Sequence, residues 1–254
     1  MKLSVKAMSK KATISSILMF QTNDTSLYWR EPLFRVYPFL DKDKGLNASW
    51  RDRKKYLAAE LSQYYIQIKD ELQKKVDTFN AHWLNNQENI IKIFTDVFNI
   101  NCYNLFNDML AEVSLNPICP RDINKNSFTV FYKSDETRFL ETALHEIVHF
   151  VWFYIWQQHF KDDSKEYESP HLKWVLSEMV VDTFVNNTGI GEFFSPQRRN
   201  SCVYRYFYTM QINNVPILQM LSNIYQNSLT LTHFMETAYK YCQDNESEIR
   251  KQML

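Results

Sequence analysis

The residues best suited to chemistry are His145, Glu146 and His149, which form the pattern His-Glu-x-x-His. On an α-helix, side chains four residues apart point the same way, so the two imidazoles can share one zinc ion. Glu146 would lie beside that ion, where it can take a proton from a water whose pKa zinc lowers from about 15.7 towards roughly 7. The pattern therefore predicts metal-dependent hydrolysis of amide bonds.

The surrounding sequence predicts that this pattern lies on a buried helix from Asp135 to Phe160. Polar residues at 133–137 provide a helix start, and neither Gly nor Pro interrupts the stretch. Apolar residues recur with helical spacing around the two histidines, and residues 150–156 are apolar on every face. The two histidines are therefore expected on a helix enclosed by its own domain.

A catalytic zinc site usually has three protein ligands and leaves the fourth position to water, so a third ligand is needed. Glu178 is the main candidate. It falls on a second predicted helix that has Ser169 as N-cap and Pro170 at the first helical position. His171, seven residues before Glu178 on that helix, is the rival ligand.

Asp182 follows Glu178 by four residues and so shares its helix face. A His-Glu-x-x-His pattern followed on a later helix by Glu-x-x-x-Asp resembles the gluzincin group of zinc metallopeptidases, over roughly residues 127 to 190. The resemblance implies zinc ligands at His145, His149 and Glu178. It also implies a general base at Glu146 and, at Asp182, a carboxylate that accepts the free N–H of a ligand histidine.

A short strand is predicted at Ser127–Tyr132, just before the histidine-bearing helix, because this segment is rich in aromatic and β-branched residues. In gluzincin-like folds an extended substrate adds its backbone to the edge of such a strand. The resemblance therefore implies that Thr129, Val130 and Phe131 offer an edge to the substrate. A buried strand with no substrate role would have the same composition.

Enzymes of this kind commonly stabilise the transition-state oxyanion with a Tyr or His that follows the third ligand. His233 and Tyr206 are the candidates, with His233 ranked ahead of Tyr206. In a chain with 15 Tyr, most tyrosines are half-buried packing residues, and that interpretation is stronger for both candidates than a catalytic one.

Composition excludes several other classes. The formal net charge is zero, with no basic stripe interleaved with aromatics, which argues against a nucleic-acid partner. The four Cys form no Cys-x-x-Cys pair, so neither a structural zinc cluster nor a disulfide framework is indicated. No run approaches the roughly 20 apolar residues of a membrane span, and the short apolar segment at 14–20 imitates a secretory signal only faintly. A cytoplasmic protein without a membrane span is expected.

The remaining elements are expected to be mainly helical. The pattern predicts a first strand at about Thr13–Gln21, a long amphipathic helix from Ser49, a second helix at Asn89–Phe98, and two or three helices after Ser201. Only three Gly occur, which argues against a mainly β architecture.

The predicted fold class is α+β and mostly helical. By the resemblance it is zincin-like, with a small β-sheet packed on the active-site helix and added helices at both ends. We expect one domain over residues 1–254, in which a helical portion at about 46–110 packs on a catalytic portion at about 111–254.

The first functional hypothesis is a zinc-dependent metallopeptidase that uses one zinc ion to cleave a peptide or protein substrate. The alternative is a non-catalytic zinc-binding interaction or regulatory protein with the same fold. Glu146 favours the enzyme, because a structural zinc site has no use for it and normally closes its fourth position with a protein ligand. A third interpretation is a helical protein whose histidines are satisfied core residues. Neither the oligomeric state nor the peptide cleaved follows from the sequence.

Overall fold

The computed structural model describes residues 1–161 and 164–253. It is 68% helical with a small mixed sheet, which confirms the α+β class. Two compact units are formed, an N-terminal unit of Met1–Gln87 and Asn104–Ala143 and a C-terminal unit of Glu88–Tyr103 and Leu144–Leu254. Residues 104–143 belong to the N-terminal unit because their strands pair with a strand at the start of the chain. A single domain that divides near residue 110 stays a prediction.

The sheet of the N-terminal unit has four strands, β1 (Leu3–Ala7), β2 (Met109–Ser114), β3 (Arg121–Asp122) and β4 (Ser127–Phe131), in the order β1-β2-β4-β3. β1, β2 and β4 run parallel, and the two-residue β3 pairs antiparallel with the start of β4. β4 confirms the strand predicted at this position. Its first four residues are all buried, as in a strand covered on both faces.

The strand predicted at Thr13–Gln21 is wrong, because helix α1 (Lys10–Met19) occupies this segment. Ser9 caps the helix, accepting a hydrogen bond on its side chain from the amide of Ala12 at 3.3 Å. The buried residues of α1 are Thr13, Ile17 and Leu18, four and five positions apart, which is a helical spacing and not the alternation of a strand.

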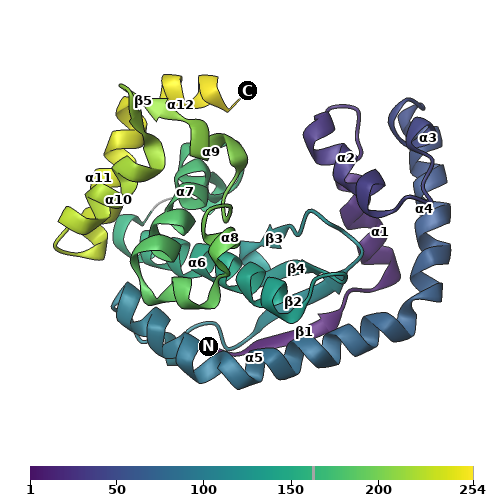
Figure 1. The fold of residues 1–254 in the computed structure, drawn as a ribbon, viewed down its shortest axis with the longest axis horizontal. Coiled ribbons are helices and arrows are strands. Elements are labelled where there is room, and N and C mark those ends of the chain that lie inside the picture. The colour runs from purple at the N-terminus through teal and green to yellow at the C-terminus, as the bar shows by residue number, and fades with distance from the viewer. Residues whose placement is uncertain (162–163, 254) are drawn as a thin grey trace. The chain divides into compact units, whose positions relative to one another are not determined.

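The other helices of this unit are α2 (Leu27–Val36), α3 (Lys42–Leu46) and α4 (Trp50–Gln67). The first part of α5 (Lys69–Phe98), up to Gln87, also belongs to it. α4 packs against both α1 and α3 (Figure 1). A short 3-10 helix, η2 (Ile123–Lys125), connects β3 to β4.

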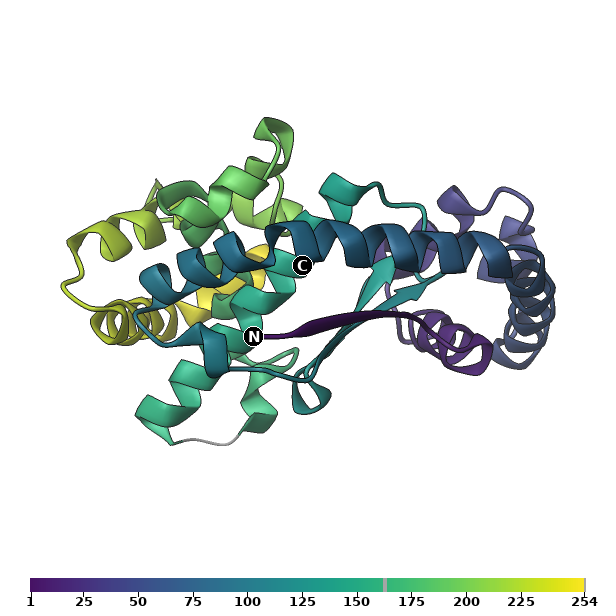
Figure 2. The same ribbon diagram turned by 90° about the horizontal axis from the view of Figure 1, so that it is seen from below.

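The long amphipathic helix predicted from Ser49 is divided at Ile68, between α4 and α5. No Gly or Pro marks this division in the sequence. The helix predicted separately at Asn89–Phe98 is the last part of α5, which runs unbroken (Figure 2). The predicted apolar stripe does form core. Its buried members are Leu57, Leu61, Ile68, Leu72, Val76, Phe79 and Trp83.

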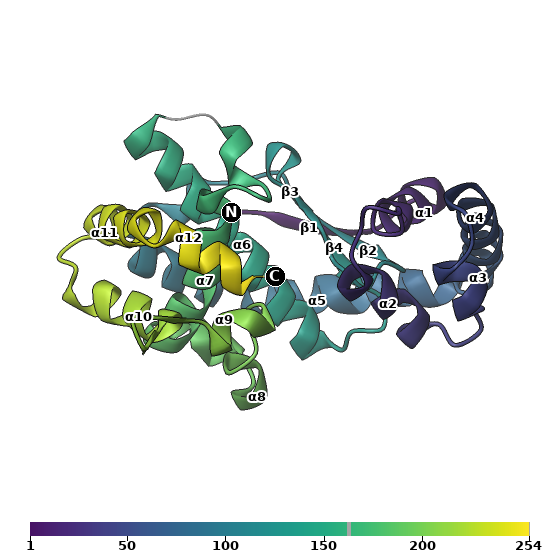
Figure 3. The ribbon, with the colours of Figure 1, turned by 90° about the horizontal axis from the view of Figure 1, so that it is seen from above.

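The C-terminal unit contains most of α6 (Glu136–Phe160) and all later elements. These are the helices α7 (Leu172–Asn187), α8 (Pro196–Arg199), α9 (Arg205–Thr209), α10 (Ile217–Asn227), α11 (Leu231–Asp244) and α12 (Glu246–Gln252), the hairpin β5 (Gln211–Ile212) and β6 (Val215–Pro216), and the 3-10 helices η3 (Ser164–Tyr167) and η4 (Gly189–Phe193). The 3-10 helix η1 (Cys102–Asn104) follows α5, and its first two residues also belong to this unit. Figure 3 shows α10 and α11 as a pair of helices beside α7. Among the helices of the described residues, none is both long and apolar enough for a bilayer span.

The helix predicted at Asp135–Phe160 is confirmed as α6, and the Asp135 side chain accepts a hydrogen bond from the amide of Arg138 at 2.7 Å. The predicted start of the second helix is wrong by two residues. His171, not Ser169, is the N-cap of α7, because its extended backbone (φ −67°, ψ 149°) prevents the helix from including Pro170.

An aromatic cluster, defined as Trp152, Phe184, Tyr225 and Phe234, joins α6, α7, α10 and α11. Trp152 lies with its ring centre 6.0 Å from that of Phe184 and 5.9 Å from that of Phe234. Tyr225 meets the same two phenylalanines edge-on at 5.7 and 5.2 Å. Edge-to-face pairs at these distances stabilise beyond the burial of area, so the cluster sets the positions of the four helices.

We predict that Phe234→Ala, which removes a fully buried ring from the aromatic cluster, lowers the free energy of unfolding by about 3–5 kcal/mol. Leu229→Ala is the matched control, because Leu229 is 94% exposed. Its effect is expected to stay within about 0.5 kcal/mol. Urea unfolding followed by circular dichroism measures both, and equal losses would contradict a cluster that supports the unit.

Candidate metal centre

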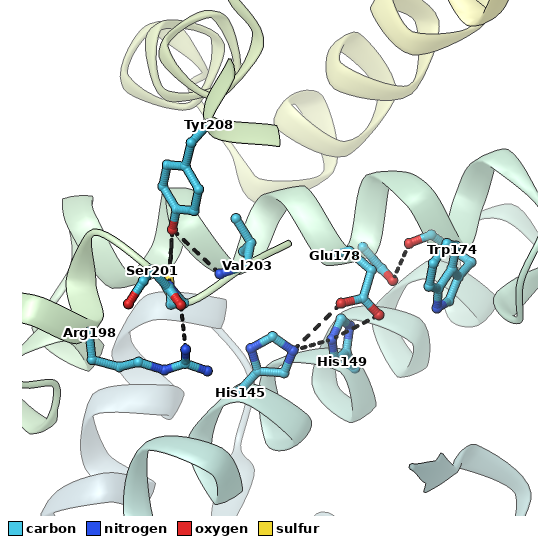
Figure 4. Close-up of polar contacts among 10 residues, drawn as sticks. His145, His149, Trp174, Glu178, Arg198, Ser201, Val203 and Tyr208 are labelled. Carbon is cyan, nitrogen blue, oxygen red and sulfur yellow. Dashed lines mark hydrogen bonds and ion pairs between the residues drawn. The ribbon is translucent and has the colours of Figure 1, made fainter. Parts of the chain in front are cut away.

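Three side chains of the C-terminal unit meet at one point, His145 and His149 from α6 and Glu178 from α7 (Figure 4). The Nε2 atoms of the two histidines are 3.1 Å apart. Each lies 3.6 Å from an oxygen of Glu178, His145 from Oε2 and His149 from Oε1. The three residues could hold a metal ion, as their types and positions in the sequence predict.

These separations fit one small divalent cation. Ligands at about 2.0–2.1 Å from a tetrahedral ion are about 3.3 Å from one another, within a few tenths of an ångström of the distances observed. The donor set of two imidazole nitrogens and one carboxylate oxygen is also one that zinc accepts.

The group is largely removed from water. The side chain of His149 is 0% exposed and that of Glu178 is 3% exposed, whereas His145 retains 15%. Burying a carboxylate is costly unless positive charge or hydrogen bonds compensate it, and either a cation or a proton on an imidazole would do so. Because His145 is the most exposed of the three side chains, solvent reaches this group mainly from the side of His145.

Glu146 follows His145 on α6 and is 7% exposed. Adjacent residues on a helix differ in direction by about 100°, so Glu146 neighbours the imidazole pair without sharing its direction. It is not one of the three side chains whose ligand atoms come together. This placement leaves its carboxylate for a role other than binding the ion.

Asp182 does not orient a ligand histidine, which corrects the prediction. Its Oδ1 atom accepts hydrogen bonds from Tyr208 Oη at 3.2 Å and Asn186 Nδ2 at 3.1 Å, and Cys202 Sγ lies 3.8 Å away. Glu178 and Asp182 lie on one face of α7, but only Glu178 contacts the histidines. Among the described residues, the enclosed Nδ1 atom of His145 has no hydrogen-bond partner.

Tyr208 and Cys202 were not predicted, and together with Asp182 they form a polar network that joins α7 to the segment before α9. The hydroxyl of Tyr208 accepts the amides of Cys202 at 3.0 Å and Val203 at 3.4 Å (Figure 4). Burial raises the pKa of the Asp182 carboxyl and that of the Tyr208 hydroxyl. It also raises the pKa of the Cys202 thiol, to about 12. No sequence signal separated Tyr208 from the other tyrosines of the chain.

Neither oxyanion candidate is placed in this group of ligands. His233 is exposed in the first turn of α11, where its amide donates to the side chain of Thr230 at 3.1 Å. Tyr206 stacks on Tyr204 with ring centres 5.5 Å apart and meets Phe207 edge-on at 4.5 Å. Both observations agree with packing or surface roles, and an oxyanion role for either residue stays a prediction.

The rival ligand His171 does not join the imidazole pair. It is exposed at the N-cap of α7 and lines a polar pocket together with Lys173, Tyr239 and Arg250. The cluster found among the described residues contains Glu178 in its place.

The predicted substrate edge is occupied in part along β4. Thr129, Val130 and Phe131 lie in the N-terminal unit, on a strand that has β2 on one side and β3 on the other. The amide of Thr129 already donates to the carbonyl of Pro120 at 2.9 Å. β3 itself pairs only with Ser127 and Phe128, so a substrate role for the backbone of Thr129–Phe131 stays a prediction.

Comparison with known proteins gives no relative. The chain matches no known family profile, and it has no significant match among curated proteins or solved structures.

We predict that the purified protein binds about one zinc ion per chain and that Glu178→Ala weakens binding by more than the 10–100-fold typical of residues outside the ligand shell. Competition with a chromophoric chelator measures the affinity. The matched control is Glu192→Ala, which removes an exposed carboxylate of the same unit. Zinc binding that Glu178→Ala leaves unchanged would remove this residue as a ligand.

We predict that Tyr208→Phe lowers the free energy of unfolding by about 1–3 kcal/mol, because it removes the hydroxyl that joins Asp182 to two amides. Tyr225→Phe is the control, since the Tyr225 hydroxyl makes no hydrogen bond among the described residues. Urea unfolding compares the two variants. An effect of Tyr208→Phe no larger than that of Tyr225→Phe would show that the network adds no stability.

Proposed function

We propose that this chain is a zinc-dependent metallopeptidase of gluzincin type, acting on a peptide or protein substrate. The observation that supports the proposal is the approach of His145, His149 and Glu178 from two helices to within bonding distance of one cation. A zincin-like fold and a cytoplasmic location belong to the same proposal and come from the sequence alone.

Zinc is proposed over other divalent cations because of the donor atoms. Magnesium and calcium prefer sites made of oxygen ligands, whereas imidazole suits zinc and other late first-row metals. When bound, zinc supplies a Lewis acid that polarises a carbonyl and makes a water acidic near neutral pH.

The residues of the chain bind the ion and transfer the proton. His145, His149 and Glu178 hold the ion and supply one negative charge against its two positive ones. Glu146, which is not part of the ligand group, takes a proton from the attacking water and passes it to the departing amine. The partial exposure of His145 marks the side from which water and substrate approach.

The alternative is a zinc-binding interaction or regulatory protein that hydrolyses nothing. One observation favours it, because Asp182 bonds to Tyr208, Asn186 and Cys202 and so is not available to support a ligand histidine. Glu146 favours the peptidase, since a structural zinc site does not need a second buried carboxylate beside it.

We predict that Glu146→Gln lowers peptide cleavage by about 10²–10⁴-fold, the usual contribution of a general base, and leaves the zinc content unchanged. Digestion of a peptide library, read by mass spectrometry, compares the parent with this variant. Glu192→Gln is the charge-matched control at an exposed position and should cleave like the parent.

Three outcomes are informative. Cleavage by the parent that Glu146→Gln abolishes supports the peptidase. Cleavage that survives this change would remove Glu146 as the base. Zinc bound without cleavage of any library member would favour the regulatory alternative.

A further inference from the structure

Two buried arginines lie together in the N-terminal unit, and neither belongs to the residues of the proposed function. Arg30 of α2 is 7% exposed and Arg53 of α4 is 2% exposed. Both donate to the same backbone oxygen, the carbonyl of Leu46, from Arg30 Nη2 at 2.8 Å and from Arg53 Nη2 at 3.1 Å. Two guanidinium groups are therefore held within hydrogen-bonding reach of one acceptor.

The two arginines differ in how many donors they use. Arg53 also donates to the carbonyls of Gln21 at 2.7 Å and Ala48 at 2.9 Å, and to the side chain of Asn23 at 3.1 Å. These bonds tie together the segments on either side of α2 and α3. Arg30 makes only the bond to Leu46 among the described residues, so most of its five donors are unused.

No carboxylate of the described residues forms an ion pair with either arginine. The neighbouring acids are engaged elsewhere, with Glu31 paired to Lys42 at 3.0 Å and Asp52 bonded to its own N-cap Ser49 at 2.7 Å. The Nε atoms of both arginines are buried without a hydrogen-bond partner. Burial and the nearby charge of Arg30 also lower the pKa of Arg53, as expected for two uncompensated cations.

The start of α2 adds to the positive charge. The side chain of its N-cap, Ser26, makes no capping hydrogen bond, so the first amides of the helix have no side-chain acceptor. Side chains on a helix lean towards its N-terminus, so that of Arg30, the fourth residue of α2, is expected to lean towards the same end. A buried positive charge with unused donors is costly unless an anion pairs with the charge and accepts hydrogen bonds from those donors.

We infer that Arg30 of α2 and Arg53 of α4 form a binding site for a phosphate-sized oxyanion, with Arg30 as the main anchor. Arg53 holds the surrounding segments and contributes charge. Arg30 supplies the free donors in the planar geometry that suits phosphate or carboxylate oxygens. The ligand class is a phosphate group, either free or carried by a larger molecule.

Thermal unfolding in sodium phosphate tests the site, with sodium chloride of equal ionic strength as the reference. The parent is expected to gain about 5 °C in Tm at phosphate about 100-fold above the dissociation constant, and the gain should rise with the logarithm of the phosphate concentration. This logarithmic dependence separates binding from the general stabilisation by excluded salts, which rises in proportion to concentration. Isothermal titration with inorganic phosphate gives the affinity directly.

Arg30→Gln should abolish the phosphate-dependent gain and weaken binding at least tenfold. Arg35→Gln is the matched control, because Arg35 lies on the same helix and is exposed, so its variant should respond like the parent. The response should also survive removal of bound metal with EDTA, which excludes phosphate bound to an ion at the proposed metal centre. No gain in the parent beyond that in sodium chloride, or a gain that Arg30→Gln retains, would overturn the proposal.

Discussion

The structure of the C-terminal unit depends on one electrostatic constraint, the burial of a carboxylate against two imidazoles. Glu178 is 3% exposed and each of its oxygens lies 3.6 Å from a histidine nitrogen. Such a group is costly unless positive charge or hydrogen bonds compensate the carboxylate. A divalent cation can be bound by all three side chains at once, whereas a single proton on one imidazole compensates the carboxylate through one histidine only.

The constraint requires α6 and α7 to keep a fixed spacing, and the packing around the group provides it. The aromatic cluster fixes α6 and α7 against α10 and α11, beyond the ligands along both helices. The network of Asp182 and Tyr208 holds α7 to the segment before α9. The ligand atoms are thus positioned by rigid helices, which is the arrangement that a metal centre needs.

The sequence predicted the features that depend on local spacing. His145 and His149 are four residues apart on one helix, and that spacing alone directs both imidazoles the same way. Glu178 was found because residue type and helix position limited the choice. The apolar stripe of α4 and α5 was likewise predicted, since a period of three to four residues specifies a buried helix face.

The features that failed depend on contacts between distant segments. The partners of Asp182 include Cys202 and Tyr208, which lie 20 and 26 residues further along the chain. No local sequence pattern predicts these contacts. How much of β4 has a free edge depends on strand order and on the length of β3, which pairs only with Ser127 and Phe128. The strand predicted at Thr13–Gln21 was wrong for a local reason. Its β-branched residues favour a strand, but helix α1 forms there and buries Thr13, Ile17 and Leu18 on one face.

Zinc K-edge X-ray absorption on the zinc-loaded protein tests the central claim most directly. The account predicts only nitrogen and oxygen ligands at about 2.0–2.1 Å, with the outer-shell scattering of two imidazoles, and loss of one oxygen ligand in Glu178→Ala. A sulfur ligand at about 2.3 Å, or a spectrum with no imidazole contribution, would contradict it, because the ion would then be bound elsewhere in the chain.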